Sequence, residues 1–222
     1  MQGYSTNWGV VWQYRAALLD ALATSAWLAA CALVLGAVFG IALAYLSIAK
    51  HRMPRGVATA YVTLVRNTPL LLLIFIVYLV LPQFGIRLFD ENWSFILALA
   101  VISGGYIGED LRAALGSIPK AYRDAASGIG LNAVQRQLYV VLPLVLRYAL
   151  PALTNSAVSI FKDTSLASII AIPDLTYVAR EISTNYFRVL EAWAVVGGIY
   201  LGVSTLLAGL SRALERSLPR IG

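Results

Sequence analysis

Long uncharged runs separated by short charged segments dominate the chain, and this pattern predicts membrane-spanning helices. A helix needs about 20 apolar residues to cross the hydrocarbon core of a bilayer. The runs predict five spans, at residues 21–49, 67–86, 92–108, 143–161 and 192–211. We expect the second helix to begin earlier, near Val57, and the fourth span carries Arg147 inside it. No long linker separates the runs, so the pattern favours one all-α polytopic membrane domain.

The basic residues predict the orientation of these spans. Five spans put the termini on opposite sides, and cytoplasmic loops carry an excess of Lys and Arg. With a periplasmic N-terminus and a cytoplasmic C-terminus, ten basic residues lie inside and five outside. The inner set is Lys50, Arg52, Arg55, Arg112, Lys120, Arg123, Arg136, Arg212, Arg216 and Arg220, and the outer set is Arg15, Arg87, Lys162, Arg180 and Arg188.

The chain divides into a short N-terminal segment and the membrane domain. Residues 1–20 lack the basic cluster of a signal peptide, and the apolar stretch that follows is too long for a signal core. Trp8, Trp12 and Tyr14 favour a periplasmic segment at the membrane interface, where aromatic rings are enriched. Residues 21–217 form the transmembrane domain, in which the glycine pairs 36/40, 104/108 and 198/202 are either close helix contacts or ordinary membrane glycines.

Composition excludes several classes of function. Of the 222 residues, 59% are hydrophobic and 13% charged, about half the charged share of a soluble domain. The net charge of +6 is spread between apolar runs, so we expect lipid headgroups and not nucleic acid as its partner. The single Cys31 and single His51 offer no metal site of the usual type. No phosphate loop or hydrolase motif is present, so we expect neither catalysis nor a bound cofactor.

The longest inner connection, about residues 113–142, reads as a helix, a glycine-containing turn and a second helix. Gly128 and Gly130 punctuate it, and Asn132 is suited to cap the helix that follows. Such a compact knob can fit a groove on a partner protein.

Four motifs in this order resemble those of the permease subunits of bacterial binding-protein-dependent ABC importers, in particular the polar amino acid permeases. Asp124-Ala125-Ala126, with Gly130 and then Leu142-Pro143, resembles the EAA loop of that family. The other three motifs are Arg66-Asn67-Thr68-Pro69-Leu70, Lys162-Asp163-Thr164-Ser165-Leu166-Ala167-Ser168 and Leu214-Glu215-Arg216. The chain departs from the family pattern at Asp124, where Glu is usual, at Ala121-Tyr122, where Gly-Gln is usual, and in the opening of the first span.

The resemblance implies the type-1 ABC permease fold in a bacterial inner membrane and a transport function. The chain would form half of a path for an amino acid or related polar solute, beside an identical or homologous second permease. A periplasmic binding protein would deliver the solute, and two copies of a separate ABC ATPase would bind and use the ATP. The residues implied in ATPase coupling are Asp124, Ala125, Ala126, Gly130 and Leu131.

Ionisable residues at membrane depth are the candidates for the translocation path or gate, because such groups are costly there and often functional. Arg66 precedes Pro69, which predicts a kinked gate helix, or Arg66 only extends toward the headgroups. Glu109 either contacts the ammonium group of a substrate or forms part of the inner gate. The alternative is that it only pairs with Arg112, three residues further along the helix.

A second set of path candidates follows the fourth span: Lys162, Asp163, Thr164 and Ser165. The apolar stretch 165–172 is too short to cross the bilayer, so it predicts a re-entrant or interfacial segment. These four residues either meet a zwitterionic amino acid or only cap a helix and fix a turn.

Two other classes of function remain open from the sequence alone. One is a channel or secondary transporter for small polar solutes that works without ATP, with the inner loop as a plain connector. The other is a membrane scaffold without transport.

Overall fold

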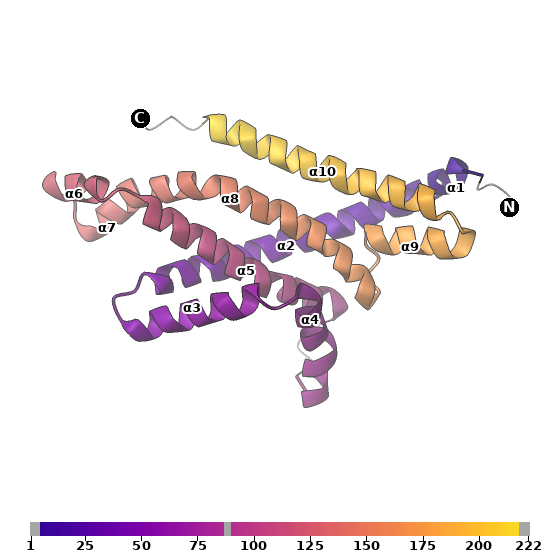
Figure 1. The fold of residues 1–222 in the computed structure, drawn as a ribbon, viewed down its shortest axis with the longest axis horizontal. Helices are drawn as coiled ribbons and strands as arrows, with labels where there is room; N and C mark the ends of the chain where they lie inside the picture. Colours follow the sequence, from indigo (N-terminus) through magenta and orange to yellow (C-terminus); the bar gives the residue numbers. More distant parts are fainter. Residues whose placement is uncertain (1–4, 87–89, 218–222) are drawn as a thin grey trace. The chain divides into compact units, whose positions relative to one another are not determined.

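The computed structural model describes residues 5–86 and 90–217, which form helices joined by short turns (Figure 1). Arg87 and Arg220 of the orientation count and residues 1–4 of the N-terminal segment lie outside the described residues. In chain order the helices are α1 (Trp8–Gln13), α2 (Arg15–Ser47), α3 (Arg52–Arg66), α4 (Leu70–Phe75), η1 (Ile76–Val80), η2 (Leu81–Phe84), α5 (Glu91–Ser117), α6 (Lys120–Gly128), α7 (Ala133–Arg136), η3 (Gln137–Val141), α8 (Leu142–Asp163), η4 (Thr164–Ile170), α9 (Leu175–Tyr186) and α10 (Val189–Ser217).

The predicted spans correspond to these long helices. Within the described ranges, four helical stretches have the length and apolar composition to cross a membrane: α2, α5, the stretch Ala133–Ile170 that contains α8, and α10. A fifth span is present if the bent pair of α3 and the helix Leu70–Phe84 counts as one. The prediction of an all-α fold with about five spans is therefore confirmed.

The second span differs from its prediction because it is broken, not kinked. α3 ends at Arg66, where the Asn67 side chain donates to the Thr63 carbonyl (2.7 Å) and the Thr68 hydroxyl donates to the Leu64 carbonyl (2.8 Å). Pro69 then sits at the N-cap of α4. Proline lacks an N–H and disfavours helical backbone in the residue before it, so a new helix starts here instead of a continued one.

The described residues divide into two compact units, each built from pieces of several helices. Of the described residues, unit one comprises 5–33, 69–86, 90–99 and 157–207, and unit two comprises 34–68, 100–156 and 208–217. In unit one, α1 packs on α9, and their apolar side chains meet the starts of α2 and α10 in one core. The members of this core are Val11, Leu18, Ala21, Leu175, Val178, Ala179, Ile182, Ala192 and Val196.

Polar contacts also hold the N-terminal segment in unit one. The Asn7 backbone N–H donates to the fully buried Glu191 side chain at 2.7 Å, and Arg188 forms an ion pair with Glu191 at 3.8 Å. The rings of Tyr14 and Tyr186 meet edge to face at 5.7 Å between centroids. The segment before α2 is thus an integral part of unit one.

In unit two, α2 and α5 approach so closely that glycine is required at their contact. A Cβ atom on Gly40 would lie 2.7 Å from the Ile107 side chain and 2.9 Å from the Gly108 backbone nitrogen. Gly36 and Gly104 belong to the same contact, so two of the three predicted glycine pairs mark a close helix crossing. The third pair, Gly198 and Gly202, has open space at its Cβ positions.

We expect Gly40→Ala to destabilise the protein, because the added methyl meets backbone that cannot move aside cheaply. Overpacking of this kind costs about 1–3 kcal/mol. The matched control is Gly202→Ala, which adds a methyl to a helical glycine with no heavy atom within 4 Å. Thermal unfolding is measured for the natural chain and the two purified variants in one detergent. The midpoint temperature should be lower than that of the natural chain for Gly40→Ala alone. Equal midpoints would show that the α2–α5 contact is looser than described.

Candidate functional site

The predicted inner loop forms a hairpin of α6 and α7 whose turn is fixed by Gly130. The N–H of Leu131 donates to the Ala126 carbonyl (3.2 Å), and that of Gly130 to the Ser127 carbonyl (3.1 Å). This is the Schellman pattern of helix termination, which needs a left-handed residue just past the helix. Gly130 supplies it with φ of +82°. Asn132 then caps α7 in a reciprocal capping box with Gln135, as its position predicts.

The hairpin has one exposed face, and its other face packs against and bonds to the rest of unit two. Asp124 and Ala125 are exposed on α6, and Ile129 at its end is 78% exposed. Ala126 is buried, so it supports α6 from within. The Arg123 guanidinium donates to the Leu115 carbonyl at the end of α5 (3.2 Å). The hairpin is therefore bonded directly to the end of α5.

A second feature of unit two is a polar pocket of about 610 Å³ between α2, α3 and α5. Arg66 and Glu109, both predicted from the sequence, line it together. Its other lining residues are Leu43, Ser47, Arg55, Ala58, Thr59, Val62, Thr63, Asn67, Tyr106, Gly108 and Arg112. Three guanidinium groups and one carboxylate give the pocket a net positive charge.

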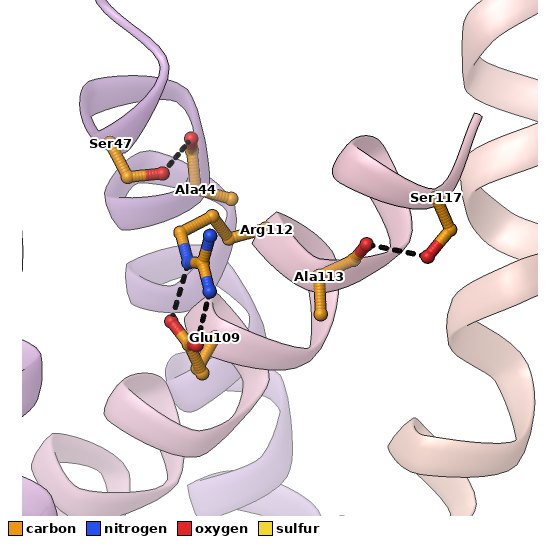
Figure 2. A network of polar contacts seen from close by, with 6 residues as sticks. All are labelled: Ala44, Ser47, Glu109, Arg112, Ala113 and Ser117. Atoms are coloured by element: carbon orange, nitrogen blue, oxygen red, sulfur yellow. Dashed lines mark hydrogen bonds and ion pairs between the residues drawn. The ribbon is translucent and has the colours of Figure 1, made fainter. Parts of the chain in front are cut away.

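The charges in this pocket are arranged in two groups. Glu109 accepts two hydrogen bonds from Arg112, at 2.6 and 2.7 Å, and Figure 2 shows this forked pair beside the end of α2 that carries Ala44 and Ser47. The predicted Glu109–Arg112 pair is thus present. The Arg66 guanidinium instead lies over the Tyr106 ring, 5.2 Å from its centroid. The Arg66 guanidinium is therefore a positive charge in the pocket that pairs with no carboxylate among the described residues.

The hydroxyl groups of the pocket donate to their own helices. Ser47 donates to the Ala44 carbonyl (2.7 Å), as Figure 2 shows, and Thr59 to the Arg55 carbonyl (2.9 Å). Their oxygen lone pairs remain as acceptors. The pocket thus combines guanidinium donors with carboxylate and hydroxyl acceptors, a combination that suits a zwitterionic solute.

Comparison with known families identifies the architecture that carries this loop and pocket. Residues 11–220 match the family model described as "Binding-protein-dependent transport system inner membrane component". The chain belongs to this family. The permease is 31% identical over 213 residues to the glutamine transport system permease protein GlnP of Escherichia coli (strain K12), covering 96% of this chain and 97% of that protein. It is 34% identical to the L-cystine transport system permease protein TcyB of Bacillus subtilis (strain 168), covering 84% and 82%.

Solved structures agree with this assignment. The permease matches a chain of an amino acid ABC transporter crystallised with histidines, with a TM-score of 0.89 and 26% identity over 97% of this chain and 100% of that one. A chain of the MetNI methionine ABC transporter matches with a TM-score of 0.80 at 16% identity, covering 94% and 99%, which supports the fold alone. The permease therefore has the type-1 ABC permease fold and is a multi-pass protein of the inner membrane.

The remaining path candidates of the permease lie in unit one, at the end of α8 and in η4. Lys162 is exposed, Asp163 and Ser165 are half-buried, and Thr164 is fully buried. The Thr164 hydroxyl donates to the Phe161 carbonyl at 2.7 Å, so it is used locally to end α8. η4 is a short 3-10 helix of seven residues, and its re-entrant or interfacial position in the membrane stays a prediction.

Sequence reasoning missed several functional candidates in the permease. Arg55, Thr59, Thr63 and Asn67 recur every fourth residue along α3, so they share one face and form the polar wall of the pocket. This spacing is visible in the sequence and would have revealed the wall. Tyr106 carries no such signal, because its role depends on α3 lying opposite α5.

Proposed function

We propose that this permease moves an amino acid across the inner membrane, driven by ATP hydrolysis on a separate ABC ATPase. The observation that carries the proposal is the exposed α6–α7 hairpin, positioned in a chain of the binding-protein-dependent family. Two ATPase copies dock on the hairpins of two permeases, either identical or homologous. A soluble binding protein delivers the solute from outside, and ATP is bound by the ATPase and not by this chain.

The hairpin is the contact that couples ATP hydrolysis to transport. Asp124, Ala125 and Ile129 offer a small charged and apolar surface, while Gly130 and Leu131 set the turn beside it. Because Arg123 bonds to the end of α5, movement of the hairpin would shift the helix that carries Glu109. The proposal has the hairpin in the cytoplasm, with the N-terminus outside and the C-terminus inside, in line with the distribution of basic residues.

The substrate class follows from the relatives and from the pocket of unit two. The relatives are named for glutamine, L-cystine and nopaline transport, all solutes with an amino acid backbone. In the pocket, Arg66 would meet the carboxylate of the solute and Glu109 its ammonium group. In unit one, a zwitterionic solute would contact Lys162, Asp163 and Ser165 at another stage of its passage. Pro69 forms the helix break at which a gate could bend.

Co-purification tests the coupling assignment. The tagged permease is solubilised from its native membranes in several mild detergents, and the proteins that stay bound are identified. We expect an ABC ATPase to be retained by the natural chain and lost with Asp124→Lys, because charge reversal on an exposed docking face repels its former partner. Glu181→Lys on α9 is the matched control and should retain the ATPase.

The opposite outcome is equally informative. A clean oligomer without any ATPase in all detergents would contradict the importer and favour an ATP-independent channel or secondary transporter. Loss of the ATPase with Glu181→Lys as well would mean that charge reversal damages the fold and that Asp124 has no special role.

A further inference from the structure

Unit one contains a buried carboxylate that the proposed function does not use. Asp174 is fully buried in the turn between η4 and α9. One carboxylate oxygen accepts the Tyr177 backbone N–H at 2.8 Å and so caps α9, and the other accepts the Tyr200 hydroxyl at 3.1 Å. Tyr200 belongs to α10, so this carboxylate joins the turn to a membrane-spanning helix.

Tyr200 extends the connection to the end of α8 and to η4. Its ring packs against that of Phe161 with 5.5 Å between centroids, and its hydroxyl lies 3.4 Å from the Thr176 hydroxyl. Thr164, the first residue of η4, is a further hydrogen-bonding neighbour of the same hydroxyl. One tyrosine thus contacts the two ends of the segment 164–174.

Within this segment Ala167, Ile170 and Ile172 are buried, and polar contacts add to their packing. Arg180 donates to the Ser168 carbonyl at 2.8 Å, and Ala171 adopts a left-handed backbone with φ of +63°. The Leu175 N–H donates to the Ser25 hydroxyl of α2 at 3.5 Å. A left-handed alanine is strained and persists only where its surroundings enforce it. The Asp174–Tyr200 contact is the link that can provide this enforcement from α10.

We propose that Asp174 and Tyr200 are positioning residues that pin η4 to α10, tightly when the carboxyl is ionised and loosely when it is protonated. The inference rests on the proposed function in one respect, namely that η4 borders the translocation path. An ionised carboxylate accepts stronger hydrogen bonds than a neutral acid, so protonation weakens the bond from the Tyr200 hydroxyl. The segment then loses its polar link to α10 and opens more often, although its buried side chains still pack.

The environment of Asp174 places this change near neutral pH. Burial raises the pKa of the carboxyl to about 6, although hydrogen bonds from Tyr177, Thr176 and Tyr200 partly oppose the shift. The groups that face it are Tyr200 from α10, Tyr177 and Thr176 from α9, Thr164 from η4 through Tyr200, and Ser25 from α2 through Leu175. The Arg180 guanidinium is bonded to Ser168 instead.

A cysteine reporter on η4 tests the pin without requiring transport. Ile169 is 43% exposed on η4, so Ile169→Cys in a Cys31→Ser chain gives one accessible thiol. The permease in complex with its ATPase, in lipid nanodiscs, is labelled with a methanethiosulfonate reagent from pH 5 to 8. The same cysteine in an Asp174→Asn chain supplies the intrinsic pH dependence of the thiol.

The expected result is a step in the normalised labelling rate near pH 6. With a pKa of about 6, the protonated fraction rises about tenfold between pH 7 and pH 5, so the rate rises severalfold toward low pH. Tyr200→Phe keeps the ring contact with Phe161 but removes the hydroxyl, so it should label fast at every pH. If labelling is flat across pH, or if Tyr200→Phe labels like the natural tyrosine, the pin is refuted.

Amino acid uptake, measured on the same complexes without the reporter cysteine, separates the pin from the proposed function. The uptake rate is measured at several pH values with a saturating concentration of loaded binding protein. In the natural chain this rate should show a step near pH 6, and the step should be absent in Asp174→Asn. A complex that shows the labelling step but imports no amino acid would contradict the proposed function and leave the pin intact. A complex that imports normally and shows no labelling step would do the reverse.

Discussion

Gly130→Asp is expected to leave the permease inserted in the membrane and to reduce solute uptake about tenfold or more. The left-handed backbone at Gly130, with φ of +82°, costs a residue with a Cβ about 1–2 kcal/mol. That strain alone shifts the turn equilibrium by about five- to thirtyfold. The new carboxylate would also extend into open space beside the proposed docking face, because a Cβ at this position meets no heavy atom within 4 Å.

Two matched variants separate these causes. Gly130→Asn has nearly the same size without the charge, and asparagine tolerates the left-handed conformation better than most residues. We expect it to retain more uptake than Gly130→Asp. Gly128→Ala changes a glycine inside α6 that also has open space around it, and it should be neutral or slightly stabilising. Normal uptake by Gly130→Asp, with normal amounts of protein in the membrane, would be strong evidence against the coupling role of this loop.

The shape of the α6–α7 hairpin could be predicted from the sequence because its stabilising contacts are local, while its coupling role stays a prediction. Gly130 and Asn132 are each fixed by contacts within five residues, a helix-ending turn in one case and a capping box in the other. Such features depend on the chain immediately around them and not on distant packing. The five spans could be predicted for a similar reason, since a long uncharged run has few alternatives to a membrane helix.

Helix ends were predicted less well, because hydropathy reports the lipid-facing run and not the hydrogen-bonded helix. α2 begins at Arg15, six residues before the predicted span, and α5 continues to Ser117 through Glu109 and Arg112. Charged residues near the ends of a membrane helix can reach the interface or pair with each other. A rule based on uncharged runs therefore stops too early.

The pocket and the buried carboxylate depend on which helices meet. Gly40 and Gly108 bring α2 against α5, and this contact places Ser47 beside the Glu109–Arg112 pair. The sequence contained the glycine pairs but not their partners. Asp174 gave no signal either, because its hydrogen-bond partner Tyr200 lies 26 residues away on another helix.

Arg66→Gln is expected to lower amino acid uptake about tenfold or more while ATP hydrolysis, stimulated by the loaded binding protein, continues. Arg66 lies over Tyr106 in the pocket, and no carboxylate in the described part of the chain pairs with its guanidinium, whereas Arg112 pairs with Glu109. Loss of a charge-assisted hydrogen bond to a solute carboxylate costs about 1.5–3 kcal/mol, which corresponds to about tenfold or more in rate. Uptake and ATP hydrolysis are measured together in proteoliposomes.

The paired readout distinguishes a path defect from a docking defect. Gly130→Asp should lower ATP hydrolysis and uptake together, because the ATPase no longer engages the hairpin. Arg66→Gln should lower uptake alone, and Arg66→Lys should recover part of it, because the charge remains although the forked geometry is lost. Arg212→Gln is the control, since Arg212 is exposed on α10, donates to the Ala208 carbonyl of its own helix and lies outside the pocket lining.

Lys162→Gln applies the same assay to the candidates of unit one. If Lys162 meets the solute, uptake falls while ATP hydrolysis continues, as for Arg66→Gln. If Lys162 and its neighbours only end α8, the exposed lysine can be neutralised without loss of uptake, because Thr164 already donates to the Phe161 carbonyl. Unchanged uptake for Lys162→Gln with a loss for Arg66→Gln would confine the solute contacts to the pocket of unit two. Unchanged uptake for both would remove the charged residues from the path and leave selection to the binding protein.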